Sequence, residues 1–269
     1  MRMCKVLKVS KSGFYSWMKM PKVAYEPKLR ADIIAFQKET HQVYGYRRLM
    51  PEMQAKGHNC TKNKALRILR EENIRGKNRK TRPYSKTPKS EVQIIPNTLN
   101  RRFEVGSPNQ WWVTDITYIW TYSGWVYLCV ILDLYSRMVV GWAVSVNPDS
   151  KLTILALHRA LALRRPGAGV YMHSDQGCQY TSKEYATSLK RLGFKHSMSG
   201  RGQCWDNAPM ESWNSTLKRE SDLVTQVRSG IDEVERALFI WIESWYNLRR
   251  RHSKLGYCSP ANFEKQKAA

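Results

Sequence analysis

The feature that most constrains the fold of this chain is a series of three strand-like segments separated by short turns. Each segment is rich in β-branched and aromatic residues, which favour extended structure. The segments read WWVTDITYIW, WVYLCVILDL and MVVGWAVSV, with turns at Ser123-Gly124 and Ser136-Arg137 between them. Segments joined by such short turns pair with their neighbours, so the sequence predicts an antiparallel meander.

Helical and strand-like segments alternate after this meander. The sequence predicts a helix capped by Ser150, a strand at 170–173, a helix from Thr181 or Ser182 to Gly193, a strand at Lys195–Met198, and helices from about Asn207 to Glu220 and from Ile231 to Leu248. The order βββ-α-β-α-β-α is typical of an α/β fold in which helices flank a mixed five-stranded sheet.

The first part of the chain is helical and basic instead. Apolar stripes predict three short helices between Pro27 and Arg75, and Thr61 is placed to cap the last one. Four basic residues accompany its apolar face: Lys62, Lys64, Arg67 and Arg70. This pattern predicts a small all-α helix-turn-helix module whose last helix enters a major groove of DNA. The alternative is a solvated helix that is basic by chance.

These patterns divide the chain into three parts. We predict a helical, helix-turn-helix-like DNA-binding region over 1–75 and an α/β domain with a C-terminal helix over 105–269. The stretch 76–104 between them is basic, and its first half contains prolines and few large apolar side chains. Such a composition is typical of a linker.

The charge of the chain indicates a polyanionic partner. It has 45 Lys and Arg against 22 Asp and Glu, a formal net charge of +23. The first 104 residues hold 25 of the basic side chains but only 8 of the acidic ones. Nucleic acid is the simplest partner, because neutralised phosphates release condensed counterions, although acidic lipid would also attract such a surface.

Location and redox state follow from what the sequence lacks. It has no stretch near the roughly 20 apolar residues of a membrane helix, and its N-terminus lacks an apolar signal-peptide core. We therefore expect a cytoplasmic protein without a membrane partner. The six cysteines are scattered, without a C-x-x-C pair. They are expected to be reduced thiols and to form neither disulfides nor a zinc site.

Three carboxylates are candidates for chemistry. Asp115 lies in the middle of the first strand, where a charge among apolar residues is costly. Asp175 follows a short strand, and Glu211 lies one turn into a helix. If they converge, their oxygen atoms suit two Mg²⁺ ions, with Mn²⁺ as a substitute. Each acid alone could equally be structural, and three rival acids remain open: Asp133, Asp149 and Asp206.

Some basic and polar residues are candidates for DNA contact. Lys218 follows Glu211 by seven residues, which is close to two helical turns and places both on one face, with Asn214 nearby. We expect Lys218 and Asn214 to contact DNA. In the C-terminal helix the aromatics are expected to pack on the core, while the arginines, Arg250 among them, are either solvated or follow the DNA backbone.

Several of these motifs resemble a known family. WWVTDITYI, HSDQG and WDNAPMESWNSTLKRE are similar to the catalytic blocks of DDE transposases with a retroviral-integrase-like core. The 35 residues between Asp175 and Glu211 match the spacing in that superfamily, as does the basic Lys218. YGYRRL, ILDLYSRMVVGWAV and WYNLRRRHSKLGYCSPANFE resemble one bacterial insertion-sequence group, in which this chain would be the second-frame (OrfB) product.

The resemblance implies a fold, an activity and partners. The fold would be RNase H-like, with an integrase catalytic core over 105–269 and with Asp115, Asp175 and Glu211 as catalytic metal ligands for two Mg²⁺ ions. The activity would be cleavage of a DNA 3′ end by water and strand transfer by the freed hydroxyl. The DNA would comprise terminal inverted repeats and target DNA, bound at the nucleoid by a homo-oligomer. The group usually acts as a fusion with a first-frame segment, which we expect to be absent from this chain.

Two other functions remain open at this point. The chain could be a non-catalytic DNA-binding partner or inhibitor of the fused transposase, which would bind the repeats with or without the carboxylates. It could also be a hydrolytic RNase H-like nuclease, which would nick DNA without joining it. A product analysis separates these functions from strand transfer.

Overall fold

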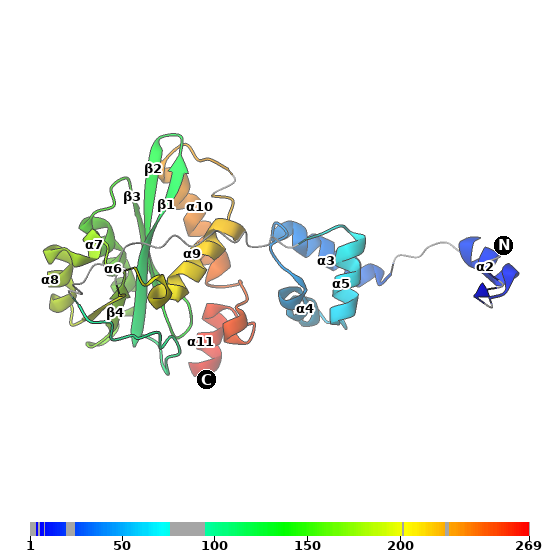
Figure 1. The fold of residues 1–269 in the computed structure, drawn as a ribbon, viewed down its shortest axis with the longest axis horizontal. Helices are drawn as coiled ribbons and strands as arrows, with labels where there is room; N and C mark the ends of the chain where they lie inside the picture. Colours follow the sequence, from blue (N-terminus) through cyan, green and yellow to red (C-terminus); the bar gives the residue numbers. More distant parts are fainter. Residues whose placement is uncertain are drawn as a thin grey trace. The chain divides into compact units, whose positions relative to one another are not determined.

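The computed structural model describes Cys4, residues 6–7, 9–19, 25–75, 95–200, 202–223 and 226–268, apart from the side chains of Trp17 and Cys204. The chain forms two compact units, Met1–Gly76 and Lys77–Ala269 (Figure 1). Most of the predicted linker, residues 76–94, lies outside the described residues, so the predicted boundaries 1–75, 76–104 and 105–269 stay predictions.

The first unit is helical, as expected. Its helices are α2 (Lys11–Lys19), α3 (Pro27–Glu39), α4 (Tyr46–Ala55) and α5 (Lys62–Glu71). Thr61 caps α5 as predicted, because its Oγ1 accepts a hydrogen bond from the Lys64 backbone N–H at 3.4 Å. Apolar side chains from α3, α4 and α5 form the small core of this unit, among them Ile33, Leu49 and Ile68.

The second unit is built on a mixed five-stranded sheet. Its strands are β1 (Trp111–Thr121), β2 (Gly124–Asp133), β3 (Val139–Ser145), β4 (Tyr171–Ser174) and β5 (Lys195–Met198). They lie in the order β3-β2-β1-β4-β5. The first three strands are antiparallel, and β4 and β5 run parallel to β1. This is the RNase H-like arrangement, which confirms the predicted fold class.

Helices cover both faces of the sheet. On one side lie α6 (Ser150–Arg164), α7 (Cys178–Thr181) and α8 (Lys183–Arg191), and on the other lie α9 (Ala208–Glu220) and α10 (Ile231–Phe239) (Figure 1). Because side chains alternate along a strand, Trp112 packs in the apolar core under α6 and α8, and Val113 packs in the core under α9 and α10. Both residues are fully buried, so β1 is the central element of the unit.

One predicted helix cap was wrong, and one predicted helix changes type along its length. We expected Ser150 to cap α6, but Oδ1 of Asp149 accepts the hydrogen bond from the Leu152 N–H at 3.1 Å. The expected single helix from Ile231 to Leu248 ends as an α-helix at Phe239 and continues as the π-helix Ile240–Tyr246. The sequence interpretation also missed α7 and the C-terminal helix α11 (Pro260–Ala268).

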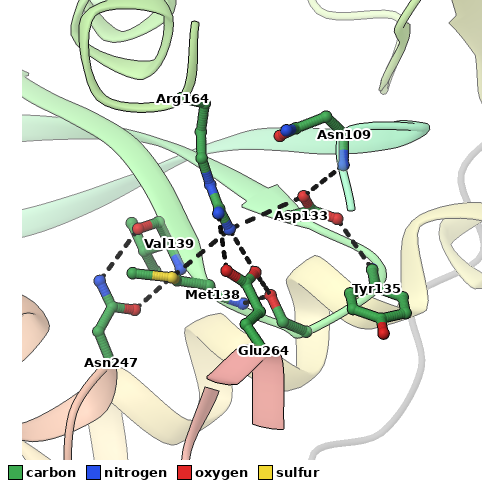
Figure 2. Close-up of polar contacts among 9 residues, drawn as sticks. Asn109, Asp133, Tyr135, Met138, Val139, Arg164, Asn247 and Glu264 are labelled. Carbon is green, nitrogen blue, oxygen red and sulfur yellow. Dashed lines mark hydrogen bonds and ion pairs between the residues drawn. The ribbon is translucent and has the colours of Figure 1, made fainter. Parts of the chain in front are cut away.

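Side chains close the outer edge of the sheet at β3. Asn247 forms two hydrogen bonds of 3.0 Å with the backbone of Val139, donating from Nδ2 to the carbonyl oxygen and accepting from the N–H at Oδ1 (Figure 2). Arg159 donates to the carbonyl oxygen of Trp142 at 3.1 Å. The amide group of Asn247 therefore makes the contacts that a neighbouring strand would make.

Arg250 corrects one expectation about DNA contact. Its side chain is only 2% exposed and binds Glu220 through two hydrogen bonds, from Nε at 2.6 Å and from Nη2 at 2.8 Å. Because the guanidinium is buried and forms this bidentate ion pair, it is not accessible to DNA. Arg250 instead joins the end of α9 to the C-terminal segment.

Candidate active site

Asp115 lies where β1 leaves its parallel neighbour. β4 pairs with Trp111–Val113 and then ends, and α9 lies beside the next part of β1. Asn207, just before α9, donates from Nδ2 to the Thr114 carbonyl oxygen at 3.1 Å. One turn beyond Glu211, Asn214 donates from Nδ2 to Oδ2 of Asp115 at 2.7 Å. Beyond the end of β4, two amide side chains therefore form hydrogen bonds with β1 at the candidate catalytic acid.

The carboxylate of Asp115 is in an unfavourable electrostatic environment. Burial and the negative charge of Asp175 raise its pKa to about 7, and Glu211 adds to this rise. Hydrogen bonds from the Ile116 N–H, at 2.9 Å, and from Asn214 oppose the rise because they stabilise the ionised form. The uncompensated negative charge favours a cation at this position.

Asp175 lies in the loop between β4 and α7. Its Oδ1 accepts a hydrogen bond from the Gly177 N–H at 3.0 Å, while desolvation by the surrounding protein raises the pKa of its carboxyl. The carboxylate is nevertheless accessible from solvent. A Cβ on Gly177 would lie 2.9 Å from Oε1 of Gln179 and 3.0 Å from Oδ1 of Asp175, so a larger residue here would press on both side chains.

Glu211 lies in the first turn of α9, and its side chain is exposed. Its charge acts on Asp115, as does that of Asp175, so the structure places both acids within electrostatic range of Asp115. Among the described residues, no three His, Cys, Asp or Glu side chains lie close enough together to form a complete metal-binding cluster. The acid set is therefore assembled around Asp115 but open on its solvent side.

The rival acid Asp133 has a structural role. It is fully buried and accepts hydrogen bonds from the backbone N–H groups of Asn109, at 2.8 Å, and Tyr135, at 2.9 Å (Figure 2). The guanidinium of Arg164 lies 3.9 Å away and also binds Glu264 of α11. These partners satisfy the carboxylate, so Asp133 stabilises the β2–β3 turn.

The other two rival acids are also satisfied locally. Asp149 caps α6 through its bond to Leu152. Asp206 is buried, and it accepts hydrogen bonds from Nε of Arg101 at 2.7 Å and from Nδ2 of Asn97 at 2.8 Å. Asp206 therefore links residues 97–101, which precede β1, to the segment that leads into α9.

The structure gives two polar residues of α9 contacts that sequence reasoning did not foresee. Asn214, which we expected to contact DNA, donates a hydrogen bond from its Nδ2 to Asp115. The Nζ of Lys218 lies 4.9 Å from the centre of the Tyr118 ring, and its side chain is exposed, so DNA contact by Lys218 stays a prediction. Asn207 was missed because its partner, Thr114, is 93 residues away in the sequence.

The basic side chains of α5 have mixed surroundings. Lys62, Arg67 and Arg70 are exposed, while Lys64 is half-buried. Lys64 lies 2.7 Å from Glu26 and Arg67 lies 2.8 Å from Glu71, so both have acidic neighbours in their own unit. DNA contact by these four residues stays a prediction.

Comparison with known proteins supports this assignment of the two units. The model of the integrase core domain family matches residues 106–204, a second integrase core domain model matches residues 192–260, and a model of the HTH-like domain matches residues 24–82. The chain is 37% identical over 273 residues to the insertion element IS600 uncharacterized 31 kDa protein of Shigella sonnei, covering 98% of each chain. It is also 37% identical to the transposase InsF for insertion sequence IS3A of Escherichia coli K12, covering 99% of this chain and 94% of the relative.

Solved structures show weaker similarity. The catalytic core domain of BIV integrase aligns with 60% of this chain and 96% of its own, at 19% identity and a TM-score of 0.46. The HTLV-2 integrase catalytic core domain in complex with magnesium aligns with 58% of this chain and 97% of its own, at 20% identity and a TM-score of 0.45.

The RNase H-like sheet and the integrase core match define a polynucleotidyl transferase. Within this class, the identity to relatives over almost the whole chain is decisive. The chain belongs to the family of bacterial insertion-sequence transposases with an integrase core and an HTH-like domain. None of the helices in the described parts of the chain is long and apolar enough to cross a membrane.

Proposed function

We propose that this transposase cuts a DNA 3′ end at Asp115, Asp175 and Glu211 and joins that end to a second DNA site. The observation that carries the proposal is the charge environment of Asp115, whose pKa is raised to about 7 by burial and by the two other acids. Burial also raises the pKa of the structural carboxylate Asp133, but there the guanidinium of Arg164 opposes the rise, whereas the charges that act on Asp115 are those of Asp175 and Glu211. A buried acid that lies within electrostatic range of two other acids favours a cationic ligand.

The donor set fits divalent metal ions, and we propose two Mg²⁺ ions, for which Mn²⁺ can substitute. Carboxylate oxygens are the ligands that these hard cations prefer, and the unrelieved charge on Asp115 and Asp175 is what they would neutralise. When bound, such ions would activate the attacking oxygen and stabilise the leaving oxygen of the phosphodiester.

The other residues of the site position these groups. The Asn214 amide and the Ile116 N–H hold the two oxygens of Asp115, and the Gly177 N–H holds Asp175. Lys218, two turns beyond Glu211, would bind a phosphate of the same strand. Water serves as nucleophile for cleavage and the freed 3′-hydroxyl serves for joining, so no covalent protein–DNA intermediate forms.

The proposed DNA partners are the terminal inverted repeats of the element and its target DNA, with the chain acting as a homo-oligomer at the bacterial nucleoid. The HTH-like unit would contact the repeats through Lys62, Lys64, Arg67 and Arg70 of α5. A first-frame product or fusion segment is the proposed protein partner. These assignments rest on the family and on the exposed basic residues of α5.

A strand-transfer assay on labelled element ends with Mg²⁺ tests the proposal. We expect cleaved and joined products from the wild-type chain and neither from Asp115→Asn or Glu211→Gln. Nicks without joined DNA would indicate a hydrolytic nuclease. Repeat binding without cleavage in every variant would indicate a non-catalytic partner, and the assay would then be repeated with the first-frame segment added. Failure in that second assay would reject the catalytic assignment.

A further inference from the structure

The hairpin of β1 and β2 carries exposed aromatic residues beyond the acid site. Tyr118 is 57% exposed, Trp120 51% and Trp125 46%. We name these three residues the hairpin aromatic patch. Trp120 and Trp125 are cross-strand partners in the hairpin. The hairpin end that carries the patch lies at the top of Figure 1, beyond α6 and α9.

The three rings form one continuous surface. The Trp125 ring lies 5.2 Å from that of Tyr118 and 4.8 Å from that of Trp120, centre to centre, in edge-to-face geometry. The opposite face of the same hairpin is buried, with Ile119 and Val126 in the core. One face of the hairpin therefore packs in the core, while the large aromatic side chains of the other face are exposed to water. An exposed apolar patch of this kind is typical of a binding surface.

A cation lies beside the patch. Nζ of Lys218 lies 4.9 Å from the centre of the Tyr118 ring. Tyr118 follows Asp115 by three residues on β1, about 10 Å along the strand, and this odd spacing points the two side chains to opposite faces. The link to the acid site is α9, which carries both Lys218 and Glu211. A ligand on the patch would thus combine flat aromatic surface with negative charge and would follow α9 from the acid site.

We propose that the hairpin aromatic patch binds unpaired nucleotides of the DNA strand that enters the acid site. Aromatic side chains stack on bases whose faces are free, and a neighbouring cation neutralises the phosphate of the same nucleotide. Paired bases inside a duplex present only their edges, so the patch distinguishes opened DNA ends from closed ones. The inference rests on the proposed function, because the acid site defines which strand passes the hairpin.

Binding measured in EDTA tests this inference separately from catalysis. The probes are two fluorescent DNAs of one sequence, a blunt duplex and the same duplex with a short unpaired overhang, titrated with the full chain. We expect Trp120→Ala and Trp125→Ala to weaken overhang binding on the order of tenfold each, with little change for the blunt duplex. Phe239→Ala is the matched control, since Phe239 is 56% exposed at the end of α10.

Each other outcome overturns the inference. Equal losses for both DNAs would show a general effect on binding, and unchanged overhang affinity would show that the patch does not contact bases. A change in oligomeric state by light scattering, with DNA affinity unchanged, would assign the patch to contact between copies of the chain. Circular dichroism of each variant verifies folding. Because cutting is absent in EDTA, failure of the strand-transfer assay leaves this result interpretable.

Discussion

Asn214 donates a hydrogen bond of 2.7 Å from its Nδ2 to Oδ2 of Asp115 and so joins α9 to the middle of β1. This bond lowers the pKa of Asp115 against the larger effect of burial. The helix that carries Glu211 therefore also determines the orientation and the protonation of the first candidate acid. The relationship leads to a pH-dependent prediction.

Asn214→Ala should shift the pH dependence of DNA cleavage to higher pH. Loss of the hydrogen bond raises the pKa of Asp115 further above its present value of about 7, so less of the carboxylate is ionised at neutral pH. A lost bond to a charged group corresponds to about tenfold lower activity at pH 7. Cleavage rates across pH 6–9 measure the shift, with Ser212→Ala on the same helix as control. An unchanged profile would refute the role of Asn214.

Asp115→Asn should stabilise the chain at alkaline pH in the absence of divalent metal. Folding raises the pKa of Asp115 from 3.8 to about 7, so the folded state loses stability as pH rises through this range. The variant avoids that loss. We expect a gain on the order of 1–3 kcal/mol at pH 8 that disappears near pH 4, reduced because Asp115 keeps some contact with solvent.

Thermal unfolding in EDTA at several pH values measures this gain, and adding Mg²⁺ should then stabilise the wild-type chain more than the variant. Equal melting temperatures at pH 8 would mean that Asp115 does not carry an unfavourable charge.

Arg250→Ala should destabilise the second unit by about 3–5 kcal/mol, because it removes both hydrogen bonds from the Arg250 guanidinium to the buried Glu220 carboxylate and leaves Arg219, at 3.4 Å, as its neighbouring cation. Urea denaturation measures the loss. Arg249→Ala is the control, since the Arg249 side chain is exposed. If Arg250→Ala keeps wild-type stability but weakens DNA binding, the original expectation of DNA contact is correct and the structural role is wrong.

Glu264→Ala should cost about 1–3 kcal/mol and loosen α11. Glu264 accepts hydrogen bonds from Arg164 and from Ser136, and its loss leaves both donors without this acceptor (Figure 2). Hydrogen exchange at residues 260–268 should rise in the variant. Glu235→Ala breaks the exposed pair with Arg159 and should cost less than about 1 kcal/mol. Equal effects of the two substitutions would contradict the structural role of the α11 contact.

Local patterns predicted the elements of this fold better than its long-range contacts. Runs of β-branched and aromatic residues and the turns between them identified all three strands of the meander, and the capping role of Thr61 was correct, because these signals lie within a few residues. The burial of Arg250 depends on Glu220, which is 30 residues away, so the expectation that Arg250 contacts DNA was wrong. Similarly, Asp149 and Ser150 are both good caps, and only the backbone geometry selects between them.

The candidate site was predictable in part. The sequence and its family resemblance named the three acids, and the structure places Asp175 and Glu211 within electrostatic range of Asp115. Their catalytic roles stay a prediction. The supporting amides could not be assigned, because the partner of Asn207 is a backbone carbonyl and that of Asn214 is a carboxylate far away in the sequence.

The two hydrogen bonds between Asn247 and Val139 have a consequence for behaviour at high concentration. β3 is the outermost strand on its side of the sheet, and such strands recruit strands from other molecules when their backbone groups are free. Asn247 occupies the Val139 N–H and carbonyl oxygen, and Arg159 occupies the Trp142 carbonyl oxygen. The sheet is thereby protected against strand-by-strand aggregation at this edge, and Asn247→Ala would remove that protection while leaving the acid residues unchanged.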